Sequence, residues 1–429
     1  MPDLKNRKQK KFQISSKKKI AFVCSGGGTK AGAFHLGVAL ALQEQGFRFY
    51  GGLKNPETPA DLPGPMDIST YVGSSAGAII ATLLAAGYSL ESIVNSFTGK
   101  NPEDPDLASD LILPRLTYQK MFTIGSPGKR KDRIKQSVFL KKLISNFLKG
   151  DISSLIKLKW LTANSPITTS GIETYIREEV LASNEFKDYK SDLFLVTTQL
   201  NHSRKVVFGK YHYEPPAEDL SCEYSNEATI SDACAASTAL PFVFAPYTIK
   251  HKDKSVAYID GEIRDTLSTH VGFDSGADLV ICSHTHQPYH LSKEVGSLTN
   301  LGFPVILVQS LYLAIEQKIN YHIESKKRVG LAVQAVHEYC KKEGISKEHS
   351  EQITQILERK LNHRMNTDTI YIHPRPHDHD TFLYEHFSLA PEKLTKIVKS
   401  GFLSAIDVLR KYEFEDRSKD QPSLKVVGS

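Results

Sequence analysis

Ser75 stands at the centre of a Gly-x-Ser-x-Gly pentapeptide, Gly73-Ser74-Ser75-Ala76-Gly77. A β-prone run at 68–72 precedes it, and small and apolar residues at 78–86 follow it. This strand–turn–helix context is typical of a nucleophile elbow, in which a serine on a tight turn attacks an acyl group. Side chains at either glycine would collide with the adjoining strand or helix, and the helix N-terminus favours negative charge developing near Ser75. The alternative is a turn in which Ser75 only caps the helix.

A second glycine-rich segment, Ser25-Gly26-Gly27-Gly28-Thr29-Lys30-Ala31-Gly32, lies between a predicted strand at 19–24 and a predicted helix at 33–44. Consecutive glycines expose backbone N–H groups to a ligand oxygen, which fits a phosphate site or an oxyanion hole. The Walker pattern is absent, and Ala31 stands where a dinucleotide fingerprint needs glycine. We therefore interpret the N–H groups of Gly26–Gly28 as an oxyanion hole, in which each donor contributes roughly 3–4 kcal/mol. A plain flexible turn is the alternative.

A candidate base follows a third apolar run, Tyr258-Ile259-Asp260-Gly261. The run predicts a strand with Asp260 at its C-terminal end, the rim where open α/β sheets build their sites. Asp-Gly is also a common turn dipeptide. A free aspartate, with a pKa of ~3.9, is a weak base towards a serine hydroxyl, so this role requires burial of Asp260 in a dry site.

The three motifs, in this order, resemble the patatin-like phospholipase family. The similarity covers about residues 19–283, including the segment 233–246 before the Asp strand and 276–281 after it. The resemblance implies a Ser–Asp dyad in a three-layer fold that needs neither metal nor cofactor. The implied activity is hydrolysis of carboxylic esters of (lyso)glycerophospholipids or related acyl lipids through an acyl-enzyme.

The resemblance assigns a role to each motif. Ser75 becomes the nucleophile, Asp260 the base, and the backbone of Gly26, Gly27 and Gly28 the oxyanion hole. Two positions depart from the family pattern. Ala31 separates the basic residue of the glycine motif from Gly32, so which N–H groups face the oxyanion is open. Glu262 follows Asp-Gly where Gly or Ala is usual, and an acid there would raise the pKa of Asp260 or turn outward.

Two alternatives remain. An α/β-hydrolase would use a histidine in a triad, and four histidines follow Asp260: His270, His284, His286 and His290. A lipase of that fold usually has a histidine before its glycine oxyanion motif, and none precedes Gly26. The second alternative is a degenerate site that serves as a non-catalytic lipid-binding or interaction module.

Strands that alternate with helices predict an α/β fold with a mostly parallel central sheet flanked by helices. We expect one catalytic domain at 19–412. It contains a helical and loop insertion at 100–165, a possible lid or membrane-contact region, and a mainly helical C-terminal part at 305–412. A disordered basic tail at 1–18 and a loose tail at 413–429 complete the expected organisation.

The charge of the chain is concentrated near its N-terminus. The net charge is +6 over 429 residues, and the first nineteen residues account for more than this excess with Lys5, Arg7, Lys8, Lys10, Lys11, Lys17, Lys18 and Lys19 against Asp3. We expect these basic residues to attract a phospholipid membrane surface rather than nucleic acid, with a purely solubilising tail as the alternative. Whether an activating protein is needed is open.

The cellular setting is predicted from what the sequence lacks. The chain has no apolar run long enough to span a membrane and no apolar core typical of a cleaved signal peptide. Its five scattered cysteines favour a reducing compartment. These features predict a cytoplasmic or peripheral membrane protein, although export without a cleaved signal stays possible.

Overall fold

The computed structural model describes residues 11–55, 57, 62–98, 112–124, 167–211, 213, 221–241, 243–251, 254–264, 266–293, 296–361, 367–376, 378 and 387–414. Most of the predicted insertion at 100–165 lies outside these residues, as do residues 1–10 and 415–429 of the predicted tails. The chain divides into two compact units, 1–285 with 369–429, and 286–368.

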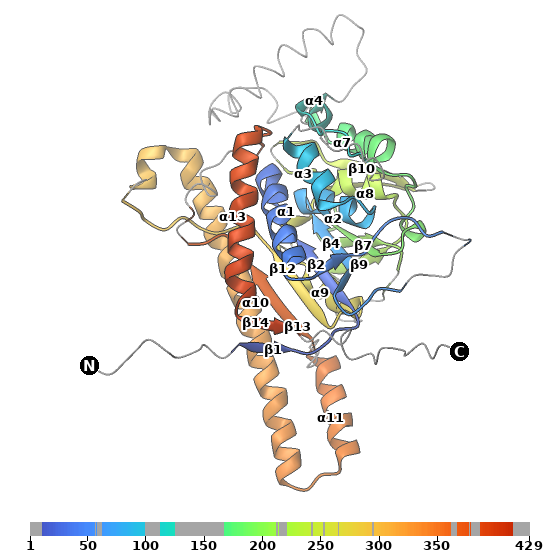
Figure 1. Cartoon of the computed structure of the whole chain (residues 1–429), viewed down its shortest axis with the longest axis vertical. Helices are drawn as coiled ribbons and strands as arrows, with labels where there is room; N and C mark the ends of the chain where they lie inside the picture. Colours follow the sequence, from blue (N-terminus) through green and yellow to red (C-terminus); the bar gives the residue numbers. More distant parts are fainter. Residues whose placement is uncertain are drawn as a thin grey trace, which may run out of the picture. The chain divides into compact units, whose positions relative to one another are not determined.

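A mostly parallel sheet forms the centre of the first unit, with ten strands within the described residues (Figure 1). Its main path runs β10–β11–β7–β4–β2–β12–β13; β3 pairs with β4, β8 with β7, and β9 with β8. The α/β class and the central sheet are therefore confirmed. The strands of this sheet are β2 (Ile20–Cys24), β3 (Arg48–Phe49), β4 (Asp67–Ser74), β7 (Asp192–Gln199), β8 (Arg204–Gly209), β9 (Cys222–Ser225), β10 (Tyr247–His251), β11 (Lys254–Asp260), β12 (Leu279–Ser283) and β13 (Asp368–Ile372).

The strands that carry the predicted site do not all run in the same direction. β2 is parallel to β4 and β12, and β4 is parallel to β7. β11 is antiparallel to β7, with Asp260 opposite Thr197. Asp260 is the last residue of a strand, as predicted, but this strand runs antiparallel to β7. Asp260 nevertheless reaches the carboxyl edge of the parallel strands, because β11 enters the sheet beyond that edge and stops level with it.

Helices cover both faces of this sheet. α1 (Gly28–Glu44) and α2 (Ala76–Ala85) share a core with Phe22 of β2. α9 (Thr269–Asp274) packs on the other face, where its Gly272 lies against Ala21 and Val280, because successive residues of a strand point to opposite faces. Among the described residues of the unit, the other α-helices are α3 (Leu90–Thr98), α4 (Tyr118–Met121), α7 (Ser170–Tyr175), which continues as a π-helical segment (Ile176–Val180), α8 (Ile230–Ser237) and α13 (Pro391–Leu409).

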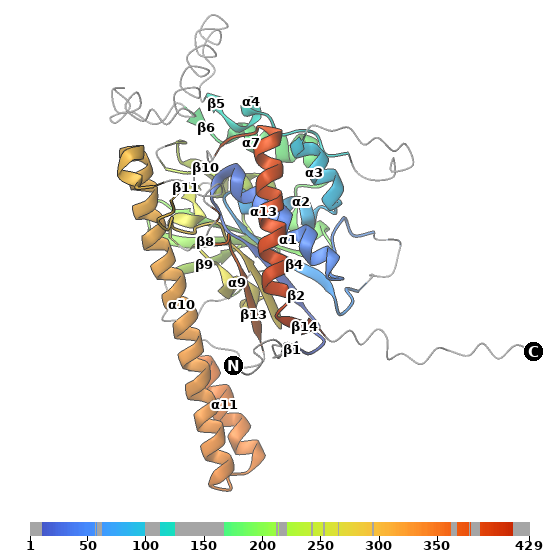
Figure 2. The same cartoon turned by 60° about the vertical axis from the view of Figure 1, so that its left-hand side comes forward.

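α13 lies along the outer side of α1 in both views of the ribbon (Figure 2). Two glycines make this contact close. A Cβ on Gly37 would lie 2.0 Å from the carbonyl oxygen of Val398, and a Cβ on Gly401 would lie 2.2 Å from that of Phe34. The two backbones therefore touch at the crossing, and any larger residue at either position would separate the helices.

Short β-strands form where the two predicted tails join the domain. Phe12–Ile14 forms β1, which pairs in parallel with β14 (Tyr412–Phe414). Aromatic packing supports the pairing: Phe12 of β1 contacts Tyr412 of β14, with ring centroids 5.7 Å apart, and the ring of Phe414 meets that of Phe47 edge to face. Lys19 is also structural: its Nζ lies 2.7 Å from Asp192 Oδ2 and 2.7 Å from the carbonyl oxygen of Ser275.

The second unit is a helical hairpin within the described residues. α10 (Phe303–Lys342) and α11 (Lys347–Lys360) are joined by a short turn that contains Gly344 at positive φ. Tyr289, which precedes α10 in the chain, is hydrogen-bonded to this helix: its backbone N–H donates to Gln309 Oε1 at 2.9 Å. Across the described residues of both units, no helix combines the length and the apolar character needed to cross a bilayer.

Candidate active site

Ser75 connects β4 directly to α2 in a strained backbone conformation. Its φ is 53° and its ψ is −126°, a region that residues other than glycine rarely adopt. Such strain costs on the order of 1–3 kcal/mol and persists where the surrounding structure enforces it. Ser75 is also buried, at 8% exposure. The local structure is therefore the sharp strand-to-helix turn that the sequence predicts.

The two glycines of the pentapeptide are required because backbones meet there. A Cβ on Gly73 would lie 2.4 Å from the carbonyl oxygen of Gly77. A Cβ on Gly77 would lie 2.2 Å from the carbonyl oxygen of Cys24, at the end of β2. The elbow therefore folds back on itself and presses against the strand that leads into the glycine loop.

Each glycine of the loop has its own reason to lack a side chain. Gly27 and Gly28 have φ values of 130° and 71°, which other residues rarely adopt. Gly26 instead faces the nucleophile: a Cβ placed on it would lie 2.8 Å from Cβ of Ser75. The structure thus brings two of the predicted motifs, the loop and the elbow, into direct contact.

The departure at Ala31 falls inside a helix. α1 begins at Gly28, five residues earlier than predicted, so Ala31 is a fully buried residue of its first turn. The following glycine, Gly32, has ordinary room: a Cβ there would lie 3.7 Å from Ile80. Ala31 therefore belongs to the helix and lies outside the loop of Gly26 and Gly27.

Lys30, the basic residue of the glycine motif, is fully buried in the first turn of α1. Burial lowers the pKa of its amine to about 7, and the nearby charge of Asp378 counteracts part of this effect. The Asp378 carboxylate in turn accepts a hydrogen bond from the Ser400 hydroxyl on α13. Lys30 thus joins the start of α1 to the C-terminal part of the unit.

Hydrogen bonds around the loop show which backbone donors are occupied. The N–H of Ser75 donates to Oγ of Ser237 at 2.9 Å, and this hydroxyl donates to the carbonyl oxygen of Val196 at 2.6 Å. Within the described part of the chain, the N–H groups of Gly26–Gly28 donate to no other backbone group. They are therefore the donors that could face an oxyanion.

His35 holds the start of the glycine loop from α1. Its Nε2 lies 2.8 Å from the carbonyl oxygen of Ser25, and its Nδ1 lies 2.7 Å from Oγ of Ser283 on β12. Burial lowers the pKa of this histidine to about 4, so the ring is neutral near pH 7. A carbonyl oxygen can only accept, so Nε2 carries the proton and Nδ1 accepts from Ser283.

The sequence did not identify His35 or Ser237 as parts of the site. Ser237 lies in the segment 233–246 that carries the family resemblance, but neither residue stands in a pattern that specifies its role. Both act through contacts between elements far apart in the sequence. Only the folded chain shows them.

Asp260 is fully buried beside Ser75. Burial raises the pKa of its carboxyl group to about 6, and hydrogen bonding from the Ser75 side chain and from the Glu262 N–H lowers it in part. The Glu262 N–H donates to Oδ1 at 2.9 Å, whereas Oδ2 is buried with no partner of normal geometry among the described residues. A buried carboxylate with one open oxygen is a competent proton acceptor at neutral pH.

The backbone around Asp260 is fixed from two sides. Its own N–H donates to the carbonyl oxygen of Ala239, at the end of α8, at 3.0 Å. A Cβ on Gly261 would lie 2.3 Å from the carbonyl oxygen of Val196 and 3.2 Å from Cβ of Ser74. The Asp-Gly dipeptide is therefore packed closely against the backbone of β7 and against the elbow. A simple exposed turn, the alternative interpretation, would have no such contacts.

No histidine acts on the pKa of Asp260 within the described residues. His284 follows β12 and stacks at 5.3 Å on His373, and His270 lies in the first turn of α9. His286 and His290 belong to the second unit. No hydrogen bond given by the described structure joins any of the four to Ser75 or Asp260.

Glu262 turns inward, towards the nucleophile. The ideal Cβ position on Gly26 lies 2.4 Å from Cγ and 3.1 Å from Cδ of Glu262, as well as beside Ser75. The Glu262 carboxylate accepts a hydrogen bond from the Ser74 hydroxyl. The outward orientation expected as one outcome is therefore excluded. The pKa of Asp260 is raised by its burial, whereas the hydrogen bond from the Glu262 N–H lowers it.

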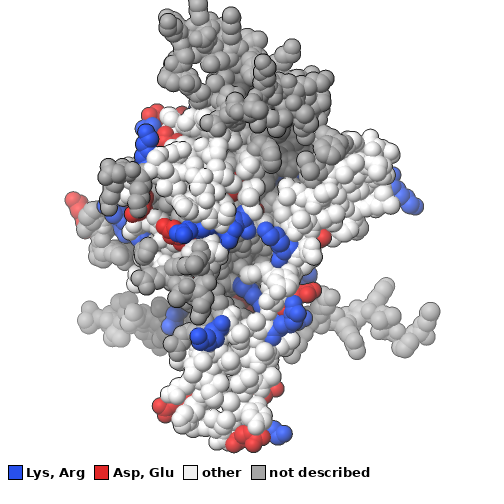
Figure 3. Space-filling model, turned by 180° about the vertical axis from the view of Figure 1, so that it is seen from behind, with Lys and Arg blue, Asp and Glu red and all other residues white. Residues whose placement is uncertain are grey.

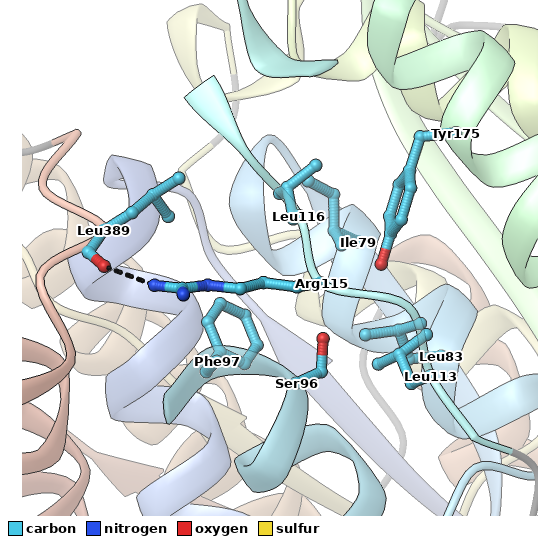
Figure 4. A pocket seen from close by; sticks show the side chains of 9 residues that line it. All are labelled: Ile79, Leu83, Ser96, Phe97, Leu113, Arg115, Leu116, Tyr175 and Leu389. Carbon is cyan, nitrogen blue, oxygen red and sulfur yellow. Dashed lines mark hydrogen bonds between the residues drawn. The ribbon is translucent and has the colours of Figure 1, made fainter. Parts of the chain in front are cut away.

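A small hollow lies one helical turn beyond Ser75, between α2, α3 and the segment 112–117 (Figure 4). Arg115 extends across it, and its guanidinium lies 3.5 Å from the carbonyl oxygen of Leu389. The free volume is only about 10 Å³, about the room of one water molecule. An acyl chain would enter only if the lining moved. The lining residues are Ile79, Leu83, Ser96, Phe97, Leu113, Arg115, Leu116, Tyr175 and Leu389.

Comparison with known proteins gives a family match for the part of the chain that contains this site. Residues 22–272 match the family model described as patatin-like phospholipase. The matched segment covers more than half of the chain and contains the glycine loop, the elbow and Asp260. A comparison with curated proteins gave no match.

Proposed function

Because the chain belongs to the patatin-like phospholipase family, a family of lipid acyl hydrolases, we propose that it hydrolyses carboxylic esters of glycerophospholipids or lysophospholipids with a Ser75–Asp260 dyad. The observation that carries this proposal is the strained Ser75 beside a buried carboxylate whose pKa is raised to about 6. An ordinary helix cap needs neither feature.

In the acylation step, Oγ of Ser75 attacks the ester carbonyl carbon. As the new C–O bond forms, the hydroxyl proton passes to Asp260 and the carbonyl electrons move to the oxygen. Oδ2 of Asp260 suits this transfer because it is buried and accepts no hydrogen bond of normal geometry within the described residues. Collapse of the intermediate breaks the bond to the alcohol, which leaves with the proton from Asp260.

In the deacylation step, water attacks the acyl-enzyme and gives a proton to Asp260. Collapse of the second intermediate then releases the fatty acid and returns the proton to Oγ of Ser75. The base is thus regenerated in each half of the cycle. The raised pKa of Asp260 supports both roles, because a pKa close to the working pH serves a base and an acid equally.

The N–H groups of the glycine loop are the proposed oxyanion donors in both steps. Gly26 lies against Ser75, and the loop leads into the N-terminus of α1, where the helix dipole favours negative charge. Loss of one such donor typically costs roughly 3–4 kcal/mol in the transition state. The N–H of Ser75 is occupied by Ser237 and is assigned no such role.

The enzyme would meet its substrate at a membrane surface. On the face seen in Figure 3, Lys and Arg side chains are separated by uncharged surface, with Asp and Glu side chains among them. Lys19 pairs with Asp192 and Lys17 is buried, so neither is free to bind lipid. The proposed attraction therefore depends on the exposed Lys18 and on the basic residues nearer the N-terminus.

The test is release of fatty acid from phosphatidylcholine and lysophosphatidylcholine by the purified full chain. We expect Ser75→Ala and Asp260→Asn each to lose at least about a thousandfold in activity, as variants of catalytic serines and their bases do. His284→Ala and His286→Ala should keep the wild-type rate. Loss with either histidine variant but not with Asp260→Asn would favour a triad, and a folded wild type that binds lipid without hydrolysis would favour a non-catalytic module.

A further inference from the structure

One side of the first half of α10 is buried. Tyr312, Ile315 and Ile319 follow one another at intervals of three and four residues, so they lie on one side of the helix, and each is at most 8% exposed. A surface helix with one buried apolar side ordinarily carries polar and charged residues on the opposite side. The opposite side of α10 does not follow this pattern.

Large apolar residues are exposed to solvent there. Ile306, Leu313 and Tyr321 are spaced by seven and eight residues, so they share a side of the helix, and Leu311 lies between this side and the buried one. In chain order, Ile306, Leu311, Leu313 and Tyr321 expose 40%, 55%, 49% and 68% of their surfaces. We call these four residues the outer face of α10.

Exposed apolar residues are concentrated in the unit that contains α10. This unit is about a fifth of the chain, yet it holds more than half of the large apolar side chains that are exposed within the described residues. Single exposed apolar residues are common on soluble proteins, whereas a group of them marks an interaction surface. The outer face of α10 is therefore a candidate for such a surface.

The charges exposed around the outer face are mostly positive. Within the residues that it spans, 306–321, Lys318 is the one exposed charged residue that the structure describes. Over the described part of 286–342, exposed basic residues outnumber exposed acidic ones. The basic residues are Lys293, Lys318, Lys327, Arg328, Lys341 and Lys342, and the acidic residues are Glu324 and Glu338.

From these features we propose that the outer face of α10 binds a phospholipid membrane surface. The helix lies along the surface, with its apolar side chains between the head groups and the acyl chains and its basic side chains against lipid phosphates. The ring and hydroxyl of Tyr321 suit this boundary, where one end of a side chain is apolar and the other is hydrated.

A second copy of the chain is the less suitable occupant. A twofold interface brings the same surface of both subunits together, and here it would oppose two surfaces with an excess of positive charge. The choice of lipid over a protein partner rests on the proposed function, because an enzyme that hydrolyses lipids must reach a membrane. Binding itself needs no hydrolysis, so the two proposals can be tested separately.

The first test measures how the full chain binds vesicles of phosphatidylcholine and phosphatidylserine. All proteins carry Ser75→Ala, so that the lipid stays intact. Sedimentation is done in about 1 M salt, where screening over about 3 Å weakens the attraction of exposed basic residues, including those near the N-terminus. The double variant Leu311→Ser with Leu313→Ser is compared with Leu62→Ser and Leu200→Ser, a matched pair of exposed leucines outside this unit.

We expect the double variant in α10 to lower the partition coefficient by about tenfold or more, because two leucines no longer leave water. The control pair should bind as the parent does. A parent that does not bind vesicles in high salt, or a folded α10 variant that binds like the control, overturns the inference. Loss of self-association by the α10 variant with unchanged vesicle binding also overturns it, and assigns the outer face to a second copy.

The second test places a fluorescent probe on the outer face. The chain has a single tryptophan, so Leu313→Trp in a Trp160→Phe background reports on position 313 alone. We expect vesicles to shift its emission to the blue and brominated lipids to quench it, whereas Gln352→Trp at an exposed position of α11 should show neither change. The same absence of change for Leu313→Trp overturns the inference. If the chain with Ser75 intact binds vesicles and releases no fatty acid, the proposed function fails and this inference stands.

Discussion

The backbone N–H of Ser75, the proposed nucleophile, donates to the hydroxyl of Ser237 on α8, at 2.9 Å. That hydroxyl donates in turn to the carbonyl oxygen of Val196 on β7. One buried side chain therefore joins the elbow, a helix and a strand. The link holds the strained turn in place and removes the N–H of Ser75 from the set of oxyanion donors.

Replacement of Ser237 by alanine should impair catalysis as well as stability. Ser237→Ala leaves the N–H of Ser75 and the carbonyl oxygen of Val196 without this partner, at a cost of roughly 1–3 kcal/mol in unfolding free energy. We expect kcat to fall in the folded variant because the elbow loosens. Urea unfolding and lipid hydrolysis measure the two effects.

Ser231 on the same helix provides the control for Ser237. It is equally buried, and its hydroxyl bonds Asn184 and Glu173. Ser231→Ala should lose stability to a similar extent and keep the kcat of the folded enzyme. Equal kcat values in the two variants would show that Ser237 has only a structural role.

The backbone strain at Ser75 should be measurable as a difference in unfolding free energy between two variants. Ser75→Gly relieves the positive φ of 53°, and we expect it to raise the unfolding free energy by roughly 1 kcal/mol relative to Ser75→Ala. Both variants lack the hydroxyl and should be inactive. A glycine variant no more stable than the alanine variant would contradict a strained elbow.

Asp260 should limit activity at low pH. The base must be ionised, so kcat/KM should fall as pH falls through about 6, the raised pKa of this carboxyl group. A pH profile with an ester substrate checks this limb. A profile flat down to about pH 4.5, near the ordinary range of free carboxyl groups, would contradict the assignment of Asp260 as the base.

The same pKa predicts an effect of opposite sign on stability. The folded chain binds the Asp260 proton more tightly than the unfolded chain, so stability is lost as pH rises from ~3.9 to about 6. Asp260→Asn avoids this cost and should be more stable than the wild type at about pH 8, by up to roughly 3 kcal/mol. Urea titrations at about pH 4 should show a much smaller difference.

The glycines of the two motifs should differ in how well they tolerate substitution by alanine. Gly77→Ala places a methyl group 2.2 Å from the carbonyl oxygen of Cys24, and we expect it to prevent normal folding of the elbow. Gly32→Ala meets Ile80 at 3.7 Å within α1 and should be neutral or stabilising by up to about 1 kcal/mol. Expression and thermal melts compare the two, and severe destabilisation by Gly32→Ala would show that the extra residue Ala31 does disturb the loop.

The sequence by itself determined the candidate nucleophile, the candidate base and the class of fold. Motifs of adjacent residues carried this information: a glycine-flanked serine after an apolar run needs a sharp turn, and alternating strands and helices need a covered parallel sheet. The family match at 22–272 covers the segment that contains these residues. The start of α1 and the existence of β1 were missed, since pairing and packing with distant segments decide them.

The tertiary structure decided what depends on contacts across the sheet. It showed that β11 runs antiparallel, so that Asp260 comes level with the end of β4 from the opposite direction. It also placed His35 against the start of the glycine loop, and Ser237 and the inward side chain of Glu262 beside Ser75. A sequence pattern shows only which residues are close along the chain. The burial that raises the pKa of Asp260, and the position of this carboxyl group beside Ser75, arise only when separate strands meet.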